Sequence, residues 1–174
     1  MIEGKRHDLW STPIWELQTE FDDEFNNKLL IESNNPDFDD FKNIWSGESE
    51  CIQIMKTYIK QVVGSIDPTL SLGNGWFYKS NINESLPVHH HGGVFMAVVY
   101  YVSVPENSGN ILFVDPRGGV NWYGTEYGNS TTSGVIPIIP KKGKLVIFPG
   151  YLFHMTEPNL STETRVSLAT NIWK

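Results

Sequence analysis

Three consecutive histidines stand in the stretch LPVHHHGGVF, residues 86–95, between a proline and a pair of glycines. Side chains alternate along an extended segment, so we expect His89 and His91 to project to one side and His90 to the other. Two imidazoles on one side are a natural pair of metal ligands, and imidazole suits Fe, Zn, Cu and Ni alike. The stretch predicts a metal site without identifying the metal, and it needs a third ligand from elsewhere.

His154 is the expected third ligand. Outside the cluster the chain has only His7 and His154, and His7 is interpreted as an ordinary residue of the N-terminal segment. His154 ends the run GKLVIFPGYLFH, a glycine-bounded apolar strand that leads into a turn, where a β-barrel would deliver a side chain to its rim. If the first segment is kinked and not extended, His90 could replace one of its neighbours.

A candidate anion site lies near the C-terminal end, where Arg165 and Ser167 share one face of a predicted strand. A guanidinium binds a carboxylate through two parallel hydrogen bonds, and a nearby hydroxyl can add a third donor. The pair therefore predicts an anionic ligand. The alternative is a surface ion pair of Arg165 with Glu163 or Glu157, an interaction that is common and weak.

The composition indicates a single domain and excludes several classes of partner. A chain of 174 residues that is 40% hydrophobic and 13% aromatic can build one core and is short for two. A formal net charge of −7 without a basic run argues against nucleic acids and anionic membranes. No stretch reaches the roughly 18 to 20 apolar residues of a membrane span, and the N-terminus lacks a signal-peptide core, so we expect a cytoplasmic protein. The single cysteine, Cys51, excludes an internal disulfide and is interpreted as a packing residue.

The first part of the chain, about 18–64, is expected to be helical and to cover a sheet. One helix is predicted within residues 20–33, where Phe21, Phe25 and Leu29 share a face. A second is predicted from Ser49, as N-cap, to Gly64, as its end. The apolar stripe of this second helix comprises Ile52, Met55, Ile59, Val62 and Val63.

The rest of the chain, about 72–174, is expected to form an antiparallel sandwich or barrel, because short β-branched and aromatic runs are separated by Gly, Pro and Asn. On the last predicted strand the side chains alternate between a polar and an apolar face. The polar face, which would line a site, comprises Arg165, Ser167, Ala169 and Asn171. The predicted strands are residues 75–81, 94–104, 110–114, 135–140, 144–149 and 165–173.

The order of the motifs is informative as a whole. H-x-H at 89–91 is followed by VVYYVSVP, FVDPR, GKLVIFPGYLFHMTEPN and RVSLATN. This order resembles the Fe(II)- and 2-oxoglutarate-dependent oxygenase superfamily, and specifically a branch of it with an H-x-H motif. The likeness runs from about Trp76 to the end, and STPIWEL at 11–17 looks like the opening strand of that branch.

The resemblance implies a mainly β chain with N-terminal helices, whose barrel is a double-stranded β-helix, a cupin-like jelly roll with Fe(II) in its open mouth. It implies that residues 1–174 form one such domain. His89 matches the first metal ligand of the family, His91 the position of its carboxylate ligand, and His154 its distal histidine. Arg165 and Ser167 match the R-x-S motif that binds the far carboxylate of 2-oxoglutarate. Tyr101, in the second position of YYV, resembles a tyrosine that shares this carboxylate.

The chain departs from the family pattern at one ligand, since H-x-D or H-x-E is the common motif. Three neutral imidazoles leave both positive charges of Fe(II) uncompensated until 2-oxoglutarate binds. Asp115 of FVDPR is a reserve carboxylate that could ligate the metal directly or orient a ligand ring. The alternative is that Asp115 is a turn residue before Pro116.

The implied activity is that of a dioxygenase that hydroxylates an unidentified substrate with release of succinate and CO₂. The loop 115–134 is long enough to be a lid, a binding element or a disordered segment. Its Arg117, Trp122, Tyr123 and Tyr127 are candidate substrate contacts, and the alternative is that the aromatic side chains pack within the loop itself. A small molecule or a peptide is the expected substrate. The N-terminal helices could pair, which leaves a homodimer open.

Two other functions stay open from the sequence. One is a cupin-like three-histidine dioxygenase that binds its substrate directly on iron without 2-oxoglutarate. The Arg165 and Ser167 pair counts against it, because the pair would have no cosubstrate to hold. The other is a barrel that binds a metal or a small anion without turnover.

Overall fold

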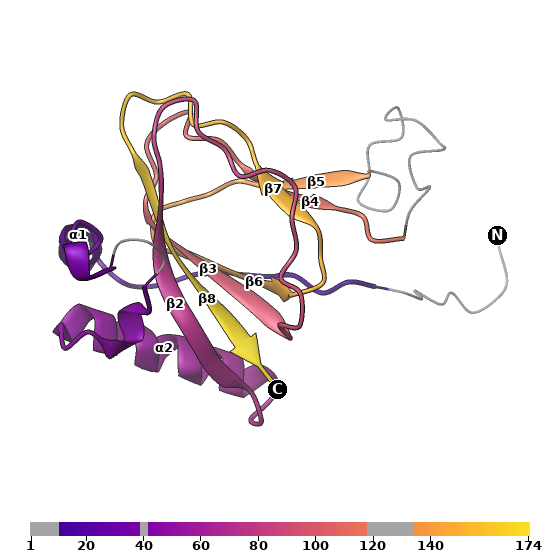
Figure 1. Cartoon of the computed structure of the whole chain (residues 1–174), viewed down its shortest axis with the longest axis horizontal. Helices are drawn as coiled ribbons and strands as arrows, with labels where there is room; N and C mark the ends of the chain where they lie inside the picture. The colour runs from indigo at the N-terminus through magenta and orange to yellow at the C-terminus, as the bar shows by residue number, and fades with distance from the viewer. Residues whose placement is uncertain (1–10, 39–41, 118–133) are drawn as a thin grey trace, which may run out of the picture.

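The chain folds into two antiparallel β-sheets with two α-helices on the outer side of the larger sheet (Figure 1). The computed structural model describes residues 11–38, 42–117 and 134–174. The helices are α1 (Asp23–Glu32) and α2 (Glu50–Ile66), with 3₁₀ turns η1 (Pro36–Phe38) and η2 (Ile44–Ser46) between them. The strands are β1 (Trp15–Gln18), β2 (Ser71–Ser80), β3 (Met96–Ser103), β4 (Ile111–Val114), β5 (Val135–Ile138), β6 (Lys144–Pro149), β7 (His154–Thr156) and β8 (Arg165–Trp173).

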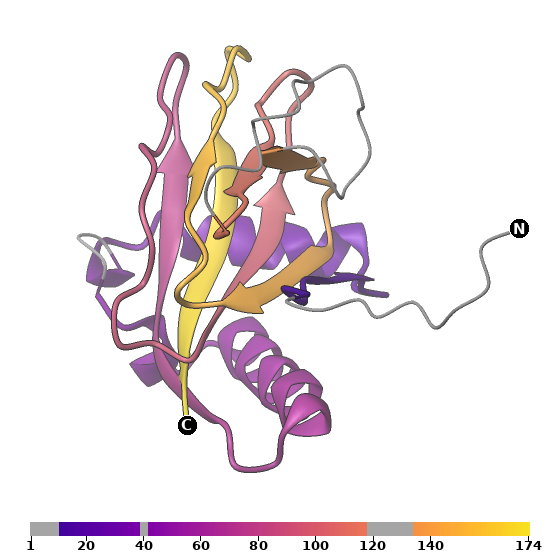
Figure 2. The same ribbon diagram turned by 90° about the vertical axis from the view of Figure 1, so that its right-hand side faces the viewer.

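The larger sheet has the strand order β1-β6-β3-β8-β2 and the smaller sheet has the order β5-β4-β7. Neighbours in the larger sheet are not consecutive in sequence, so β8 lies between β3 and β2 although it is the last strand (Figure 2). All the strand pairs are antiparallel. The expectation of a mainly β chain with N-terminal helices is confirmed.

Alternation along each strand of the larger sheet sends side chains to two different cores. Tyr100, Leu145 and Leu168 face the helices, where they pack with Ile52, Met55 and Ile59 of α2 among others. The predicted apolar stripe of α2 therefore covers the sheet, as expected.

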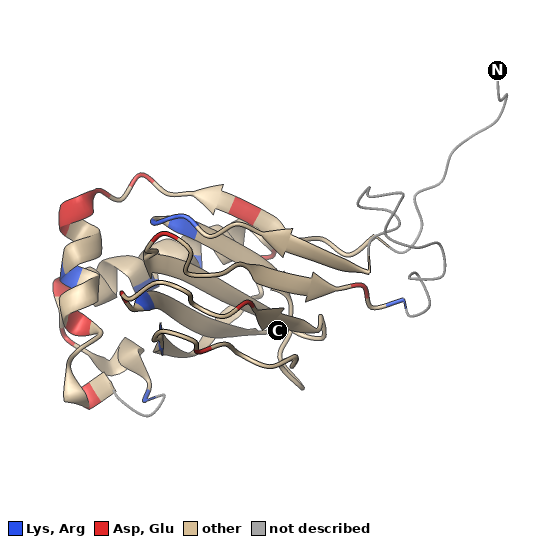
Figure 3. Ribbon diagram, turned by 90° about the horizontal axis from the view of Figure 1, so that it is seen from above, with Lys and Arg blue, Asp and Glu red and all other residues tan. Residues whose placement is uncertain are grey.

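The second core lies between the two sheets. Ala97, Val146 and Phe148 of the larger sheet pack there with Ile111 and Phe113 of the smaller one. Because both faces of β3 and β6 are covered, these strands are almost uniformly buried. The charged positions lie mostly on the helices and connections, and most strand positions carry no charge (Figure 3).

The helix ends differ from the sequence expectation. Asp22 caps α1, because its Oδ1 accepts from Phe25 N at 2.8 Å. Ser49 is the N-cap of α2, but its side chain makes no capping hydrogen bond and its Oγ lies 3.2 Å from the buried Cys51 Sγ. The prediction that Gly64 ends this helix was wrong: α2 continues to Ile66 and its C-cap is Asp67. A glycine ends a helix by taking the left-handed conformation itself, whereas Gly64 keeps a negative φ inside α2 and the C-cap Asp67 is extended.

Two strand predictions also need correction. β2 begins at Ser71, before the predicted residue 75, and its pairing with β8 shifts register between Leu72 and Gly75. β7 was not predicted as a strand, because three residues are too few to show a period of two. Tertiary pairing creates β7, since its residues bond to β4. No helix in the three described ranges is long and apolar enough to cross a membrane.

Replacing Gly64 by alanine is expected to stabilise the protein. Gly64 lies inside α2, and an added Cβ would meet no atom within 4 Å. Alanine lowers the conformational entropy of the unfolded chain, so we expect the free energy of unfolding to rise by about 0.5–1 kcal/mol in urea titrations. The contrasting variant is Gly143→Ala, which should destabilise, because Gly143 has φ +80°. A Gly64→Ala protein that unfolds at lower urea would contradict the assignment of this residue to the helix interior.

Candidate metal and anion site

An antiparallel bridge brings the first and third predicted ligands together. The backbone N–H of His89 donates to His154 O and the N–H of His154 donates to His89 O, both at 2.9 Å. The two ring centroids are 4.2 Å apart. A segment near residue 89 and the strand β7 are thus held at a defined register by backbone hydrogen bonds.

His91 completes a group of three imidazoles. Its ring centroid lies 5.6 Å from that of His89 and 5.2 Å from that of His154. One potential ligand atom from each ring lies within 4.8 Å of the other two, a spacing that could hold a metal ion. His90 projects away, as the alternation predicted: it is exposed and its ring packs edge-on against Phe153 at 4.7 Å.

Backbone carbonyls set the protonation of two of the rings. His89 Nδ1 lies 2.7 Å from Pro87 O, and His154 Nδ1 lies 2.9 Å from Leu152 O. A carbonyl oxygen can only accept, so Nδ1 carries the proton in each neutral ring. The Nε2 lone pairs of both rings are therefore available to a metal.

The surroundings of His91 and His154 favour the neutral ring. Burial, with a smaller contribution from the neighbouring histidines, lowers the pKa of His154 to about 4. Burial also lowers the pKa of His91. Neutral imidazole is the form that binds a metal, so these rings need not lose a proton at neutral pH to act as ligands.

A close backbone crossing fixes the position of the histidine segment. His91 N donates to Gly150 O at 2.8 Å, and Gly150 N donates to Phe95 O at 3.0 Å. A Cβ added at Gly150 would lie 2.2 Å from Val94 O. Only a residue without a side chain allows the two segments to approach this closely.

The histidines open into a cavity of about 240 Å³ between the two sheets. Arg165, Ser167 and Ala169 line it, so the polar face predicted for the last strand does face the interior. The other lining residues are Trp76, Tyr78, Leu86, His89, His91, Ala97, Val98, Val99, Tyr101, Ile111, His154, Thr156 and Thr170.

Arg165 is a buried cation in this cavity. Its side chain is 2% exposed, and its Nη1 donates to the carbonyls of Ser108 at 2.7 Å and Gly109 at 2.9 Å. Burial lowers the pKa of this guanidinium, although arginine still keeps its proton. None of the ion pairs in the described part of the chain involves Arg165, so the alternative of a surface ion pair with Glu163 or Glu157 does not hold. A buried guanidinium without a carboxylate favours an anionic ligand.

Two tyrosines stand beside this guanidinium. Tyr101 is 3% exposed, and burial raises its pKa to about 12. Tyr78 also lines the cavity, and burial raises its pKa as well. Tyr78 was missed from the sequence, because only the pairing of β2 with β8, which sets Tyr78 opposite Ser167, brings it to the site.

The remaining predicted residues lie elsewhere. Asp115 is not part of the histidine group: it accepts hydrogen bonds from Nε and Nη2 of Arg117 and from Arg117 N, and these lower its pKa. Arg117 is thus paired with Asp115 at the end of β4. The predicted contacts Trp122, Tyr123 and Tyr127 lie outside the described residues.

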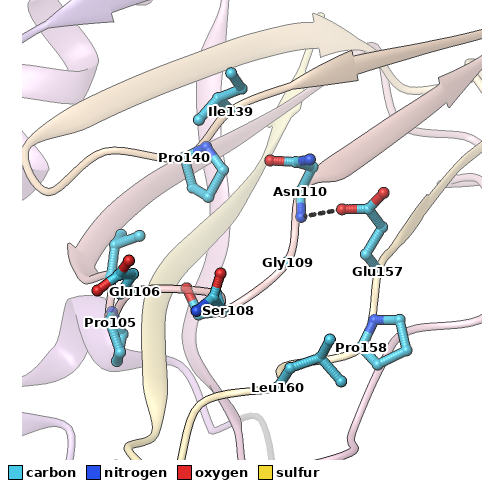
Figure 4. Close-up of a pocket in the computed structure, with 12 residues that line it drawn as sticks. Pro105, Glu106, Ser108, Gly109, Asn110, Ile139, Pro140, Glu157, Pro158 and Leu160 are labelled. Carbon is cyan, nitrogen blue, oxygen red and sulfur yellow. Dashed lines mark hydrogen bonds between the residues drawn. The ribbon is translucent and has the colours of Figure 1, made fainter.

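A second cavity, of about 710 Å³, is larger but lacks this chemistry (Figure 4). Ser108 and Gly109, whose carbonyls hold Arg165, also line it, together with Asn110, whose N–H donates to Glu157. Its charged groups are the carboxylates of Glu106 and Glu157, and no histidine, lysine or arginine lines it. The smaller cavity is therefore the candidate site, because it combines imidazoles with a buried cation.

Comparison with known proteins gives a family and a fold. Residues 74–171, more than half of the chain, match the family described as "Putative 2OG-Fe(II) oxygenase". No curated protein matches the chain in sequence.

Solved structures with a similar fold cover most of the chain. One is a prolyl-4-hydroxylase from Pseudomonas putida, with 17% identity, a TM-score of 0.70 and coverage of 94% of this chain and 89% of that one. SnoN, a non-heme α-ketoglutarate-dependent epimerase from nogalamycin biosynthesis, has 13% identity, a TM-score of 0.72 and coverage of 94% and 78%. HygX from Streptomyces hygroscopicus, solved with nickel and 2-oxoglutarate, has 12% identity, a TM-score of 0.68 and coverage of 92% and 81%. The likeness confirms the expected double-stranded β-helix.

The stability of the metal-free protein is expected to fall between pH 6.5 and pH 4 through His154. Its folded pKa is about 4 against 6.5 for the ordinary side chain, so the unfolded chain binds more protons in this window. The free energy of unfolding then falls with falling pH, by roughly 3 kcal/mol across the whole window. Urea titrations in a chelator at several pH values measure this slope. His154→Gln should flatten it relative to wild type and to the exposed control His90→Gln, and equal slopes would contradict the buried neutral ring.

Replacing Gly150 by alanine is expected to displace the histidine segment. The atom that the new Cβ meets at 2.2 Å is the backbone oxygen of Val94, which cannot swing away as a side chain can. We expect metal affinity to fall about 10- to 100-fold, the range for lost outer support of a metal ligand. Titration with Co(II) measures it. The control is Gly92→Ala, whose Cβ would meet only His90 Cε1 at 3.7 Å, and a Gly150→Ala protein with wild-type affinity would refute the role of this crossing.

Proposed function

The chain belongs to the 2OG-Fe(II) oxygenase family, with Fe(II) as metal and 2-oxoglutarate as cosubstrate; on this premise we propose that it is a dioxygenase that hydroxylates a small molecule or a peptide. The observation that carries the proposal is one cavity lined both by three imidazoles and by a buried guanidinium that has no acidic partner among the described residues. We further propose that residues 1–174 act as one catalytic domain, because helices and strands share a core.

The metal ligands in this proposal are His89, His91 and His154. Their donor atoms lie within 4.8 Å of one another, and two of the rings hold their protons on Nδ1 against backbone carbonyls. Three imidazoles fit Fe(II) and leave coordination positions for a keto acid and oxygen. Asp115 has no part in this assignment, since it is engaged by Arg117.

Arg165 is proposed to bind the far carboxylate of 2-oxoglutarate. The guanidinium keeps donors beyond the two that Nη1 gives to Ser108 and Gly109, since arginine has five N–H groups. Charge supports the same ligand, because three neutral rings leave both charges of the metal uncompensated and Arg165 adds another. A doubly anionic cosubstrate that spans the cavity compensates both ends.

The metal and the cosubstrate supply the oxygen chemistry, and the side chains around them bind the cosubstrate. Bound Fe(II) and 2-oxoglutarate together supply the activation of O₂, in which the keto acid becomes succinate and CO₂ and one oxygen atom enters a C–H bond of the substrate. Ser167 adds a hydroxyl donor beside Arg165. Tyr101 stays protonated because burial raises its pKa to about 12, so it can donate to the same carboxylate.

The walls of the cavity keep the reacting centre dry. Ala97, Val99 and Ile111 line the same cavity as the histidines and Arg165 with apolar surface. Exclusion of water strengthens the charge interactions with the cosubstrate and protects reactive groups from solvent. Arg117 and Trp122 remain predicted substrate contacts, and the structures of similar fold include both a prolyl hydroxylase and an epimerase of a biosynthetic route.

Anaerobic mixing with Fe(II) and 2-oxoglutarate tests the proposal. We expect weak visible charge-transfer absorption and, after addition of air, succinate. Arg165→Met should raise the 2-oxoglutarate concentration that half-saturates the absorption about 10- to 100-fold, since a charge-assisted hydrogen bond contributes about 1.5–3 kcal/mol. The control is Lys60→Met, which removes an exposed positive charge on α2.

The outcomes separate the competing functions. Metal binding without any effect of 2-oxoglutarate would favour a three-histidine dioxygenase that binds its substrate directly, or a non-catalytic barrel. Metal affinity that is unchanged in all of His89→Ala, His91→Ala and His154→Ala would overturn the metal site itself.

A further inference from the structure

The three imidazoles are not held in the same way. His89 and His154 each place Nδ1 against the carbonyl two residues earlier, at 2.7 Å and 2.9 Å. For His91 the corresponding carbonyl is His89 O, and this oxygen already accepts from His154 N in the bridge. In the described structure, the His91 ring makes no hydrogen bond to this carbonyl, which is used by the bridge that joins the other two ligands.

The end of β8 lies next to the His91 ring. Phe95 N donates to Ile172 O, and Ala97 pairs with Asn171, which ties the segment after His91 to the last residues of β8. Trp76 pairs with Ala169 across β2 and β8, and its ring stacks on His91 at 6.5 Å between centroids. Asn171 follows Arg165, Ser167 and Ala169 on the face of β8 that lines the interior.

The side-chain oxygen of Asn171 is a hydrogen-bond acceptor that lacks a donor in the described structure. Its Oδ1 is buried and, in the described structure, no donor reaches it at full hydrogen-bonding geometry. The carboxamide lies close enough to His91 to raise the pKa of that ring, against the larger lowering by burial. Leaving a buried amide oxygen without a hydrogen bond costs about 1–3 kcal/mol of stability. A hydrogen bond from a neighbouring donor removes this cost.

We infer that Asn171 is a positioning residue for the metal: its Oδ1 accepts the N–H of His91, and the other ring nitrogen is thereby aimed at the ion held by His89 and His154. This inference rests on the proposed function, because it needs His91 as a ligand. It identifies what supports an imidazole at the position where the family commonly has a carboxylate, a ligand that has no second N–H to satisfy.

A neutral acceptor has an electrostatic consequence. A carboxylate at position 171 would orient His91 equally well and would add a negative charge beside the metal. An amide orients the ring and leaves the site positive, which preserves its attraction for a dianionic cosubstrate. Asn171 therefore orients His91 without adding a negative charge to the site.

Titration of the metal-free protein with Co(II) alone, followed by visible absorption, tests the inference. Asn171→Leu keeps the approximate volume and removes the acceptor, and we expect Co(II) affinity to fall about 10- to 100-fold. Asn171→Asp restores an acceptor, so it should bind Co(II) at least as tightly as wild type but 2-oxoglutarate more weakly. Asn171→Ala replaces the leucine variant if that one does not fold, as judged by thermal unfolding.

A double-mutant cycle distinguishes positioning from general packing. In the His91→Ala background, Asn171→Leu should cause no further loss of Co(II) affinity, because its only route to the metal is through His91. The control is Asn110→Leu, the same replacement in the second cavity (Figure 4), which should leave Co(II) affinity unchanged.

Each contrary result has one meaning. Wild-type affinity in Asn171→Leu, full additivity with His91→Ala, or an aspartate variant as weak as the leucine variant would overturn the role of Asn171. If His89→Ala and His154→Ala also leave Co(II) affinity unchanged, the three-histidine site fails, and with it the proposed function.

Discussion

The site depends on the pair of backbone hydrogen bonds between His89 and His154. These residues are separated by the whole of β3, β4, β5 and β6, yet their N–H and C=O groups exchange bonds of 2.9 Å in both directions. Backbone pairing defines the register, and a shift by one residue would turn each imidazole to the opposite side. The Gly150 crossing tightens the same contact from the other end, so His91 has little freedom to leave the group.

The same bridge explains why the ligands need different partners. His89 O accepts the backbone N–H of His154, and in the described residues the His91 ring does not use this carbonyl in the way that the other two rings use theirs. The ring that replaces a carboxylate is thus the one without a backbone acceptor, and the buried Oδ1 of Asn171 lies beside it. A histidine in place of a carboxylate at position 91 therefore needs a hydrogen-bond acceptor, and this acceptor is Asn171 on β8.

Burial leaves the two kinds of basic side chain in the cavity in different charge states. It lowers the pKa of His154 to about 4, which leaves the ring neutral and ready to bind a metal. It cannot neutralise Arg165 at any ordinary pH, so the guanidinium remains a buried charge whose hydrogen bonds, among the described residues, go to the carbonyls of Ser108 and Gly109. The cavity is therefore built for a ligand that is anionic at one end and can meet a metal at the other.

Much of this arrangement follows from local patterns. The period of two on β8 placed Arg165 and Ser167 on one face, and the alternation of His89, His90 and His91 separated the ligand pair from the exposed ring, because strand geometry depends on neighbouring residues alone. The order of motifs was sufficient for the family and the fold. Tyr78, β7 and the interior position of Gly64 were not predictable in this way: Tyr78 reaches the site through pairing of β2 with β8, β7 exists because β4 lies beside it, and α2 continues past a residue that often ends helices. Tertiary structure alone decided which acceptor each imidazole receives, since hydrogen bonds between distant segments depend on register that no short stretch of sequence encodes.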